Sequence, residues 1–261
     1  MELTKRVAHK PFIHEVPHAK GVVLFIHGIL EGPYQFRGLA DIANQNGYSS
    51  YAILLPGHGD SAERFSRIEK QVWLNYVEQT IRRLSKDYQQ IIIVGHSMGC
   101  LLGLLTSLRY PQIKKAFLIS TPLKLKLSFR GLRCSIKVAR GKVDEKDIYT
   151  TAIYRAWSIK RAKHLITYLR WIPRYLDLFS LVRETNKKLG EIKIPLTIVH
   201  CKDDEFVSDE SINVFKRHLT CKYNVLELPK SGHFYFTEDE KRQLNSYFEK
   251  FITNKKEAVT K

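Results

Sequence analysis

A serine, a histidine and one of two adjacent aspartates have side chains that could together carry out attack on a carbonyl carbon. Ser97 lies between two glycines in the stretch IIIVGHSMGCLLGLL, and the pair Asp203-Asp204 and His233 each follow a later apolar run of strand length. A serine hydroxyl is a weak nucleophile at neutral pH. It needs a basic histidine, and the histidine needs a carboxylate that orients it. These residue types, in this chain order, suit acyl transfer through a covalent intermediate.

The elements that must position these residues alternate between strand and helix patterns. Six short and nearly continuous apolar runs predict strands covered on both faces, at 22–27, 50–54, 91–95, 116–120, 196–200 and 224–228. Helical patterns lie at 34–46, 70–88, 98–110, 208–219 and 238–254. This alternation predicts an α/β fold with a mostly parallel central sheet and helices on both faces.

One long segment interrupts the alternation. Residues 121–190 contain no clear strand and carry helix-period patterns. Such a segment is too long for a simple loop. We therefore expect residues 1–120 and 191–261 to form the core and residues 121–190 to form a helical cap, or lid, over one end of the sheet.

The surroundings of Ser97 favour a sharp turn from a strand into a helix. Gly95 and Gly99 flank the serine as Gly-x-Ser-x-Gly, after an apolar run and before a leucine-rich helical pattern. A strained turn of this kind leaves no room for side chains at the flanking positions and exposes the serine hydroxyl. The N-terminus of the following helix favours the negative charge that develops during acyl transfer.

Several motifs together resemble one superfamily. The segments VVLFIHGILEG, LLPGHGDS, VGHSMGC, KDDEFV and SGHF occur in this order along the chain. The set is similar to that of the α/β-hydrolases, and most similar to the bacterial carboxylesterase and monoacylglycerol lipase-like group, which is also described as lysophospholipase-like. The resemblance runs from about residue 22 to residue 251, except over the cap. It implies an α/β-hydrolase fold and an activity without a cofactor.

The resemblance assigns roles to individual residues. Ser97 would be the nucleophile, and His233 would be the general base and then the general acid. The family pattern Gly-x-x-Asp-x-x-Val aligns with residues 201–207, which makes Asp204 the acid of the triad, although Cys201 stands where the family has glycine. The adjacent Asp203 remains the alternative acid.

The resemblance also places an oxyanion hole, which is a pair of backbone N–H groups that bind the developing negative charge. The donors would be Met98, directly after the nucleophile, and Ile29, after the His-Gly pair of the first hydrolase strand. His27, His58 and His96 lie in motif loops and are interpreted as structural. No cluster has metal-ligand spacing, so no metal is expected.

These observations predict a serine ester hydrolase of the carboxylesterase, monoacylglycerol lipase or lysophospholipase type. The alternatives are an acyltransferase, thioesterase or carbon–carbon bond hydrolase that uses the same triad, and a non-catalytic binding protein on the same fold. The expected substrate is a small-molecule or single-chain lipid ester. The oligomeric state stays open.

The charge suggests a further partner. The net charge is +17, and residues 121–190 alone hold 17 Lys and Arg against 5 Asp and Glu. Basic and aromatic residues alternate there, which suits peripheral contact with an anionic membrane, although the aromatic residues could equally pack the cap onto the sheet. No motif for specific nucleic-acid binding occurs. Residues 1–17 lack the apolar core of a signal peptide, so we expect a cytoplasmic protein, with contact at the inner membrane surface as a further hypothesis.

Overall fold

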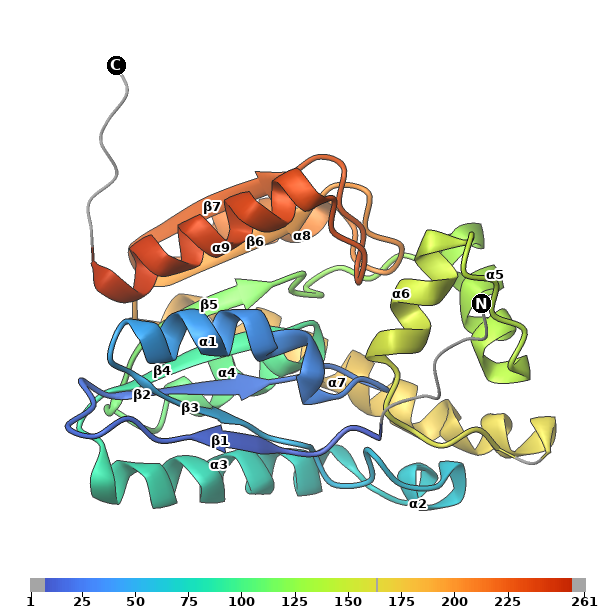
Figure 1. Ribbon diagram of the computed structural model, residues 1–261, viewed down its shortest axis with the longest axis horizontal. Helices are drawn as coiled ribbons and strands as arrows, with labels where there is room; N and C mark the ends of the chain where they lie inside the picture. Colours follow the sequence, from blue (N-terminus) through green and yellow to red (C-terminus); the bar gives the residue numbers. More distant parts are fainter. Residues whose placement is uncertain (1–7, 163, 255–261) are drawn as a thin grey trace.

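A seven-stranded sheet organises the chain (Figure 1), and the computed structural model describes residues 8–162 and 164–254. The segment 1–17, on which the expectation about a signal peptide depends, lies partly outside these residues. The strands are β1 (Phe12–His14), β2 (Val22–Ile26), β3 (Ser49–Ala52), β4 (Ile91–His96), β5 (Ile113–Ile119), β6 (Leu196–Cys201) and β7 (Tyr223–Leu228).

The topology confirms the prediction of a mostly parallel sheet. The strand order is β1-β3-β2-β4-β5-β6-β7, and every neighbouring pair is parallel except β1 with β3. All six predicted strands form, and β2 and β4 are buried along their whole length. The antiparallel edge strand β1 was not predicted, because its three residues are too few for a periodic pattern and only Phe12 is even partly buried.

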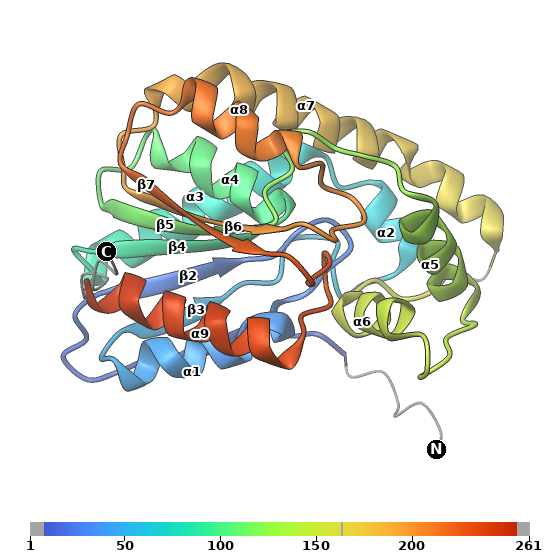
Figure 2. The same cartoon turned by 90° about the horizontal axis from the view of Figure 1, so that it is seen from above.

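Helices cover both faces of the sheet (Figure 2), which explains why its central strands are apolar throughout. The α-helices are α1 (Arg37–Gln45), α2 (Ala62–Ser66), α3 (Lys70–Asp87), α4 (Met98–Ser107), α5 (Phe129–Arg140), α6 (Ile148–Ala156), α7 (Ile172–Lys188), α8 (Glu210–His218) and α9 (Glu238–Thr253). Short 3-10 helices are η1 (Pro33–Phe36), η2 (Leu165–Trp171) and η3 (Leu189–Glu191). Helices α1 and α9 pack on one face, and α3, α4, α7 and α8 pack on the other.

The segment between β5 and β6 is helical, as the pattern predicts, and α5, α6 and η2 lie together at one end of the molecule (Figures 1 and 2). Ser128 caps α5 by accepting a hydrogen bond from Gly131 N–H at 3.0 Å, and Gly141 ends the helix in the left-handed conformation. Helix α7 instead runs along α4 and α3, so the last part of the inserted segment also covers the sheet. In the described part of the chain, no helix is both long and apolar enough to cross a bilayer.

Candidate active site

Ser97 lies at the turn between β4 and α4, where the sequence pattern places it. Its backbone has φ 51° and ψ −124°, a region that costs a non-glycine residue of order 1–3 kcal/mol. Its N–H donates to Ile119 O at 2.9 Å, which holds the turn against β5. The serine is therefore held in a strained position at the N-terminus of α4, and the surrounding structure must compensate for that strain.

Glycine at position 99 allows this turn to lie close to the sheet. A Cβ atom there would lie 1.9 Å from Ile26 O of β2, which is too close for any side chain. Gly95 occupies the other flank of Ser97 and belongs to β4. The glycines of the Gly-x-Ser-x-Gly pattern thus have a steric reason, as the sequence interpretation expected.

Asp204 and His233 form a buried pair. The histidine is 3% exposed and the aspartate 2%, and His233 Nδ1 lies 2.7 Å from Asp204 Oδ2. The other oxygen, Oδ1, accepts the backbone N–H groups of Phe206 and Val207, both at 2.8 Å. Burial alone would raise the pKa of Asp204, but the charge of His233 and these hydrogen bonds outweigh it and lower the pKa. The carboxylate is thus fixed in its charged form against the histidine ring.

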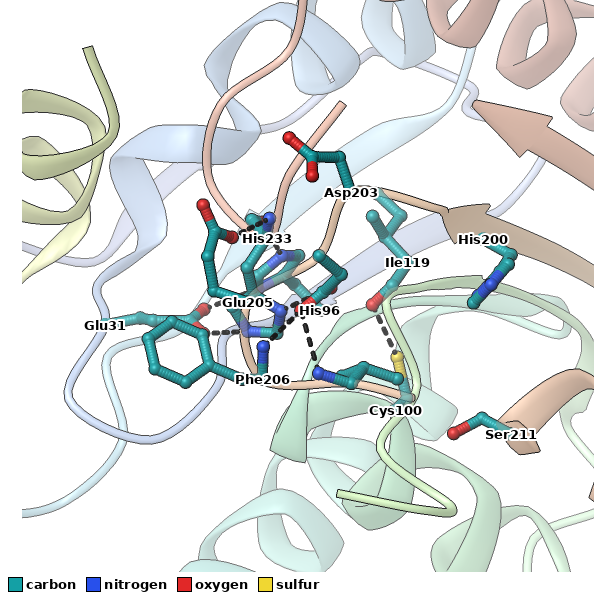
Figure 3. Close-up of polar contacts among 12 residues, drawn as sticks. Glu31, His96, Cys100, Ile119, His200, Asp203, Glu205, Phe206, Ser211 and His233 are labelled. Carbon is teal, nitrogen blue, oxygen red and sulfur yellow. Dashed lines mark hydrogen bonds and ion pairs between the residues drawn. The ribbon is translucent and has the colours of Figure 1, made fainter. Parts of the chain in front are cut away.

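The neighbouring Asp203, the alternative acid, points away from the histidine (Figure 3). Its carboxylate accepts a hydrogen bond from the Tyr149 hydroxyl at 2.6 Å and pairs with Arg130 at 2.8 Å. Arg130 belongs to α5 and Tyr149 to α6. Asp203 therefore ties the two cap helices to the loop after β6, and Asp204 is the carboxylate that contacts His233.

A third acid holds the backbone of His233. Glu205 is 2% exposed, and its Oε2 accepts the His233 N–H at 2.8 Å. Burial acts to lower the pKa of the His233 ring, but the charge and hydrogen bond of Asp204, with smaller contributions from Glu31 and Glu205, outweigh it and raise the pKa. The ring is thus a stronger base than an isolated histidine.

The two expected oxyanion donors are free to act. In the part of the chain that the structure describes, neither Ile29 N–H nor Met98 N–H has a hydrogen-bond partner. The loop of Ile29 also lies against Ser97, because a Cβ at Gly28 would sit 2.7 Å from the Ser97 Cβ and 2.3 Å from Glu31 Oε1. The arrangement brings the two N–H groups to the neighbourhood of the nucleophile from two different elements.

Glu31 is a buried carboxylate that the sequence interpretation missed. It is 1% exposed, and its Oε2 accepts hydrogen bonds from Gly28 N–H at 2.7 Å, Gln35 Nε2 at 2.7 Å and His96 Nδ1 at 2.8 Å. Its other oxygen lies 3.9 Å from His233 Nε2 (Figure 3). The available signal was a lone acidic residue in the otherwise uncharged loop sequence FIHGILEGPYQF.

His96 completes this network. Its Nδ1 faces Glu31, and its Nε2 lies 2.9 Å from the backbone oxygen of His233. Both partners are acceptors, so the ring satisfies both bonds only when both nitrogens carry hydrogen. Burial would raise the pKa of Glu31, but the charge and hydrogen bond of His96, with His233 and Gln35, outweigh it and lower the pKa. The Glu31 carboxylate is therefore buried in its charged form beside the candidate nucleophile.

The same three residues raise the question of a metal ion. Ligand atoms of Glu31, His96 and His233 lie within 4.8 Å of one another. However, both His96 nitrogens and one Glu31 oxygen are already engaged in hydrogen bonds. A metal ion would have to break these bonds, so we interpret the cluster as a hydrogen-bond network.

The other histidines of the motif loops have structural contacts. His27 Nε2 accepts the Leu55 N–H at 3.0 Å, and its Nδ1 bonds Gly28 O at 2.8 Å. Burial is the main cause that lowers the pKa of His27 to about 3, and burial lowers the pKa of His58 to about 4. Both rings are thus neutral at physiological pH and join two loops next to the site.

Residues 157–160, which we call the cap strap, lie across the loop after β2. Trp157 forms an antiparallel bridge with Glu31, and Ser158 N–H donates to Leu30 O at 2.8 Å. The strap thus pairs with the segment that carries one expected oxyanion donor. Ser97 itself is only 6% exposed.

A cleft of about 670 Å³ lies beside the site, on the side of α1 and α9, and Ser97, Asp204 and His233 are not among the residues that line it. Helix α6, the N-terminal part of α9 and the aromatic residues after His233 contribute to its walls, and His96 lines it as well. The volume is within the range of pockets that hold small molecules.

One family model and two curated proteins match the sequence of this chain. A family model described as serine aminopeptidase, S33 (Hydrolase_4) matches residues 17–240. Two curated relatives, each named "Probable alcohol acetyltransferase", from Cyberlindnera fabianii and Cyberlindnera jadinii, are 26% identical over 196 and 179 residues. These alignments cover 72% and 65% of this chain but 52% and 47% of the relatives. The chain therefore spans about half the length of the curated relatives it matches.

Solved structures share the fold over nearly the whole chain. A structure of the metagenome-derived lipolytic enzymes LipS and LipT has a TM-score of 0.74 at 16% identity and covers 95% of this chain and 98% of its own. The monoacylglycerol lipase of Paleococcus ferrophilus has a TM-score of 0.66 at 17% identity, with 93% and 99% covered. Est1E of Butyrivibrio proteoclasticus has a TM-score of 0.63 at 18% identity, with 94% of both chains covered. At these identities the similarity establishes the α/β-hydrolase fold.

Proposed function

Because the chain belongs to the serine aminopeptidase S33 family of α/β-hydrolases, we propose that it is a serine ester hydrolase with Ser97, His233 and Asp204 as its triad. The observation that carries the proposal is the buried Asp204–His233 hydrogen bond of 2.7 Å, together with a serine held at a strained turn at the N-terminus of α4. Solved relatives that are lipases and esterases support the same class of reaction.

The mechanism that we propose is that of a serine triad. His233 takes the proton of the Ser97 hydroxyl as the oxygen attacks the ester carbonyl carbon, and Asp204 stabilises the imidazolium that forms. The protonated ring then gives its proton to the leaving alcohol, which leaves an acyl-enzyme. Water attacks the acyl carbon with His233 again as base, and the acid is released with Ser97 restored.

Two backbone donors would stabilise the tetrahedral intermediates. The N–H groups of Ile29 and Met98 have no other partner among the described residues, so they are available to the carbonyl oxygen as it gains charge. A single donor of this kind contributes about 2.7–4 kcal/mol to lowering the barrier. Glu31 would hold this loop in place through the Gly28 N–H.

The substrate that we propose is an uncharged or lipid ester of modest size, such as a monoacylglycerol, a lysophospholipid or a short acyl ester. The cleft of about 670 Å³ is lined by both apolar and polar side chains, which suits a molecule with an acyl part and a polar alcohol part. Because Ser97, Asp204 and His233 are buried, we expect the protein to enclose the ester during the reaction.

Hydrolysis of p-nitrophenyl esters with acyl chains of increasing length tests this proposal. We expect turnover that is lost in Ser97→Ala and retained in Ser107→Ala, which changes a serine at the far end of the same helix. Labelling by a fluorophosphonate probe should likewise be lost in Ser97→Ala and retained in Ser107→Ala. A folded protein that neither turns over any ester nor reacts with the probe would instead be a binding protein on this fold.

Acyl transfer to an alcohol is the second candidate. Two observations favour it: both curated relatives are named "Probable alcohol acetyltransferase", and Ser97 is only 6% exposed, which limits competition from water. The acyl-enzyme is common to both reactions, so the fate of the acyl group decides between them. Product analysis with an added alcohol should give mainly the free acid for a hydrolase and mainly the new ester for a transferase.

A further inference from the structure

Large apolar side chains are exposed on the outside of the cap. Of the thirteen such residues in the described part of the chain, eleven belong to residues 121–190. The structure thus divides the aromatic and leucine residues of this segment into two groups. Leu123, Trp157 and Trp171 are buried against the core, as simple packing would require, whereas Leu127 and Phe129 are 82% and 83% exposed.

Helix α5 turns an apolar stripe toward solvent. Phe129, Leu132 and Ile136 are exposed and lie three and four residues apart, so they share one side of the helix. Cys134 and Val138 are buried and belong to the opposite side. The apolar stripe is therefore additional to the face with which α5 packs on the protein.

Helix α7 repeats this arrangement in its first half. Ile172, Leu176 and Phe179 are 52%, 59% and 49% exposed at spacings of four and three residues. The buried Leu178 and Leu181 belong to another side of the helix. Ile166 and Leu169 of η2 extend the exposed set toward the end of the molecule where α5 also lies (Figure 2). We call Leu127 and the exposed apolar residues of α5, η2 and α7 the cap face.

Positive charges accompany the cap face. Arg140 of α5, Arg170 of η2 and Arg183 of α7 are exposed, and none of them forms an ion pair with any residue that the structure describes. The segment as a whole holds 17 Lys and Arg against 5 Asp and Glu. Exposed apolar area of this extent normally marks a binding surface, and here its electrostatic environment would attract an anionic partner.

We propose that the cap face docks on the surface of an anionic lipid bilayer. Apolar residues interleaved with cations on outward helix faces fit the boundary between acyl chains and anionic headgroups, where each side chain finds its own environment. Nucleic acid would use the cations but leave the apolar stripes without a partner. This inference does not depend on the reaction at Ser97, because it uses residues outside the candidate site.

Sedimentation of the full chain with vesicles tests the proposal. Vesicles of phosphatidylcholine alone are compared with equimolar phosphatidylcholine and phosphatidylglycerol. We expect the protein to bind the anionic vesicles, to bind the neutral vesicles much more weakly, and to dissociate at high salt because the charge attraction is screened. The double variant Leu127→Ser/Phe129→Ser should lower the lipid affinity by about tenfold or more, because it removes two apolar side chains that would insert.

The matched control is Ile13→Ser, which removes a large apolar residue that is 55% exposed but belongs to β1, outside the cap. It should bind vesicles like the wild type, and thermal melting should show all variants folded. Three results would each overturn the proposal. Two are a failure to bind anionic vesicles and vesicle binding that the double variant leaves unchanged. The third is a dimer, measured by ultracentrifugation, that forms through the cap face and prevents vesicle binding.

Discussion

Replacing Glu31 by glutamine should lower the free energy of unfolding by about 1.5–3 kcal/mol. The two side chains have almost the same shape, so the hydrogen bonds from Gly28 N–H and Gln35 can remain. The negative charge that faces His96 is removed. The change therefore tests what the buried charge of Glu31 contributes and leaves the packing of the loop almost untouched.

The size of the effect depends on how His96 responds. With glutamine at position 31, His96 loses the charged partner of one of its two hydrogen bonds and keeps the bond to the His233 carbonyl. The loss is then close to that of one charge-assisted hydrogen bond, about 1.5–3 kcal/mol. For a domain of this size, each kcal/mol lowers Tm by about 2–4 °C.

The dependence on pH identifies the charge as the cause. The pKa of Glu31 is lower in the folded chain than in the unfolded chain, so the pair stabilises the fold above the unfolded carboxyl pKa of about 4.3. That contribution is lost as pH falls through the lowered folded pKa. The difference between wild type and Glu31→Gln, measured by urea unfolding from neutral to acid pH, should therefore be largest near neutrality and shrink toward acid pH.

Glu240→Gln is the matched control. Glu240 is also buried, at 7% exposure, and it accepts hydrogen bonds from Lys230 N–H and the Ser231 hydroxyl without a histidine partner. It should cost less than Glu31→Gln. Equal costs for the two variants, or a difference between wild type and Glu31→Gln that stays constant with pH, would refute the ion pair.

Three further predictions, two of them with a control variant, test the site and its frame. Asp204→Asn should lower kcat by about 10⁴-fold, as removal of a triad acid does, whereas Asp203→Asn should leave kcat within a few-fold and loosen only the cap. Gly99→Ala should destabilise the fold by more than about 4 kcal/mol, measured by urea unfolding, because its Cβ would overlap a backbone oxygen of β2. Gly38→Ala, in a helix with open space around it, should instead stabilise by about 0.5–1 kcal/mol. The acid limb of kcat/KM should lie above about 6.5, the ordinary histidine value, since the pKa of His233 is raised; a limb below that value would contradict the raised pKa.

The parts of the fold that could be predicted are those with a local signal. The buried parallel strands appear as apolar runs, and the elbow at Ser97 appears as two glycines at fixed spacing. The pairing of Asp204 with His233 followed from a family pattern, since 29 residues separate them in sequence. The family resemblance also supplied the interpretation of Ile29 as an oxyanion donor.

The parts that could not be predicted depend on contacts between distant segments. Glu31 is one acidic residue in a loop, and only its contact with His96, 65 residues away, gives it meaning. Asp203 and Asp204 are neighbours in sequence, and their different tasks become visible only when α5 and α6 are in place around Asp203. The exposure of side chains in residues 121–190 is a similar case. Trp171 and Phe129 are both large aromatic residues in the sequence, but Trp171 is buried in the fold and Phe129 is exposed.

The cap strap has a consequence for the order of events in a turnover. Ser158 donates its N–H to Leu30 O, and Trp157 bridges to Glu31, so the strap and the loop after β2 move as one unit or separate by breaking these bonds. Lifting the strap to admit an ester therefore disturbs the peptide next to Ile29. The enzyme that we propose would therefore be inactive while the strap is open. It would stabilise the transition state again only after the strap has closed. The reaction would then take place while the strap is closed, and the product would leave while it is open. The slower of the opening and closing motions of this four-residue segment would set the upper limit on turnover.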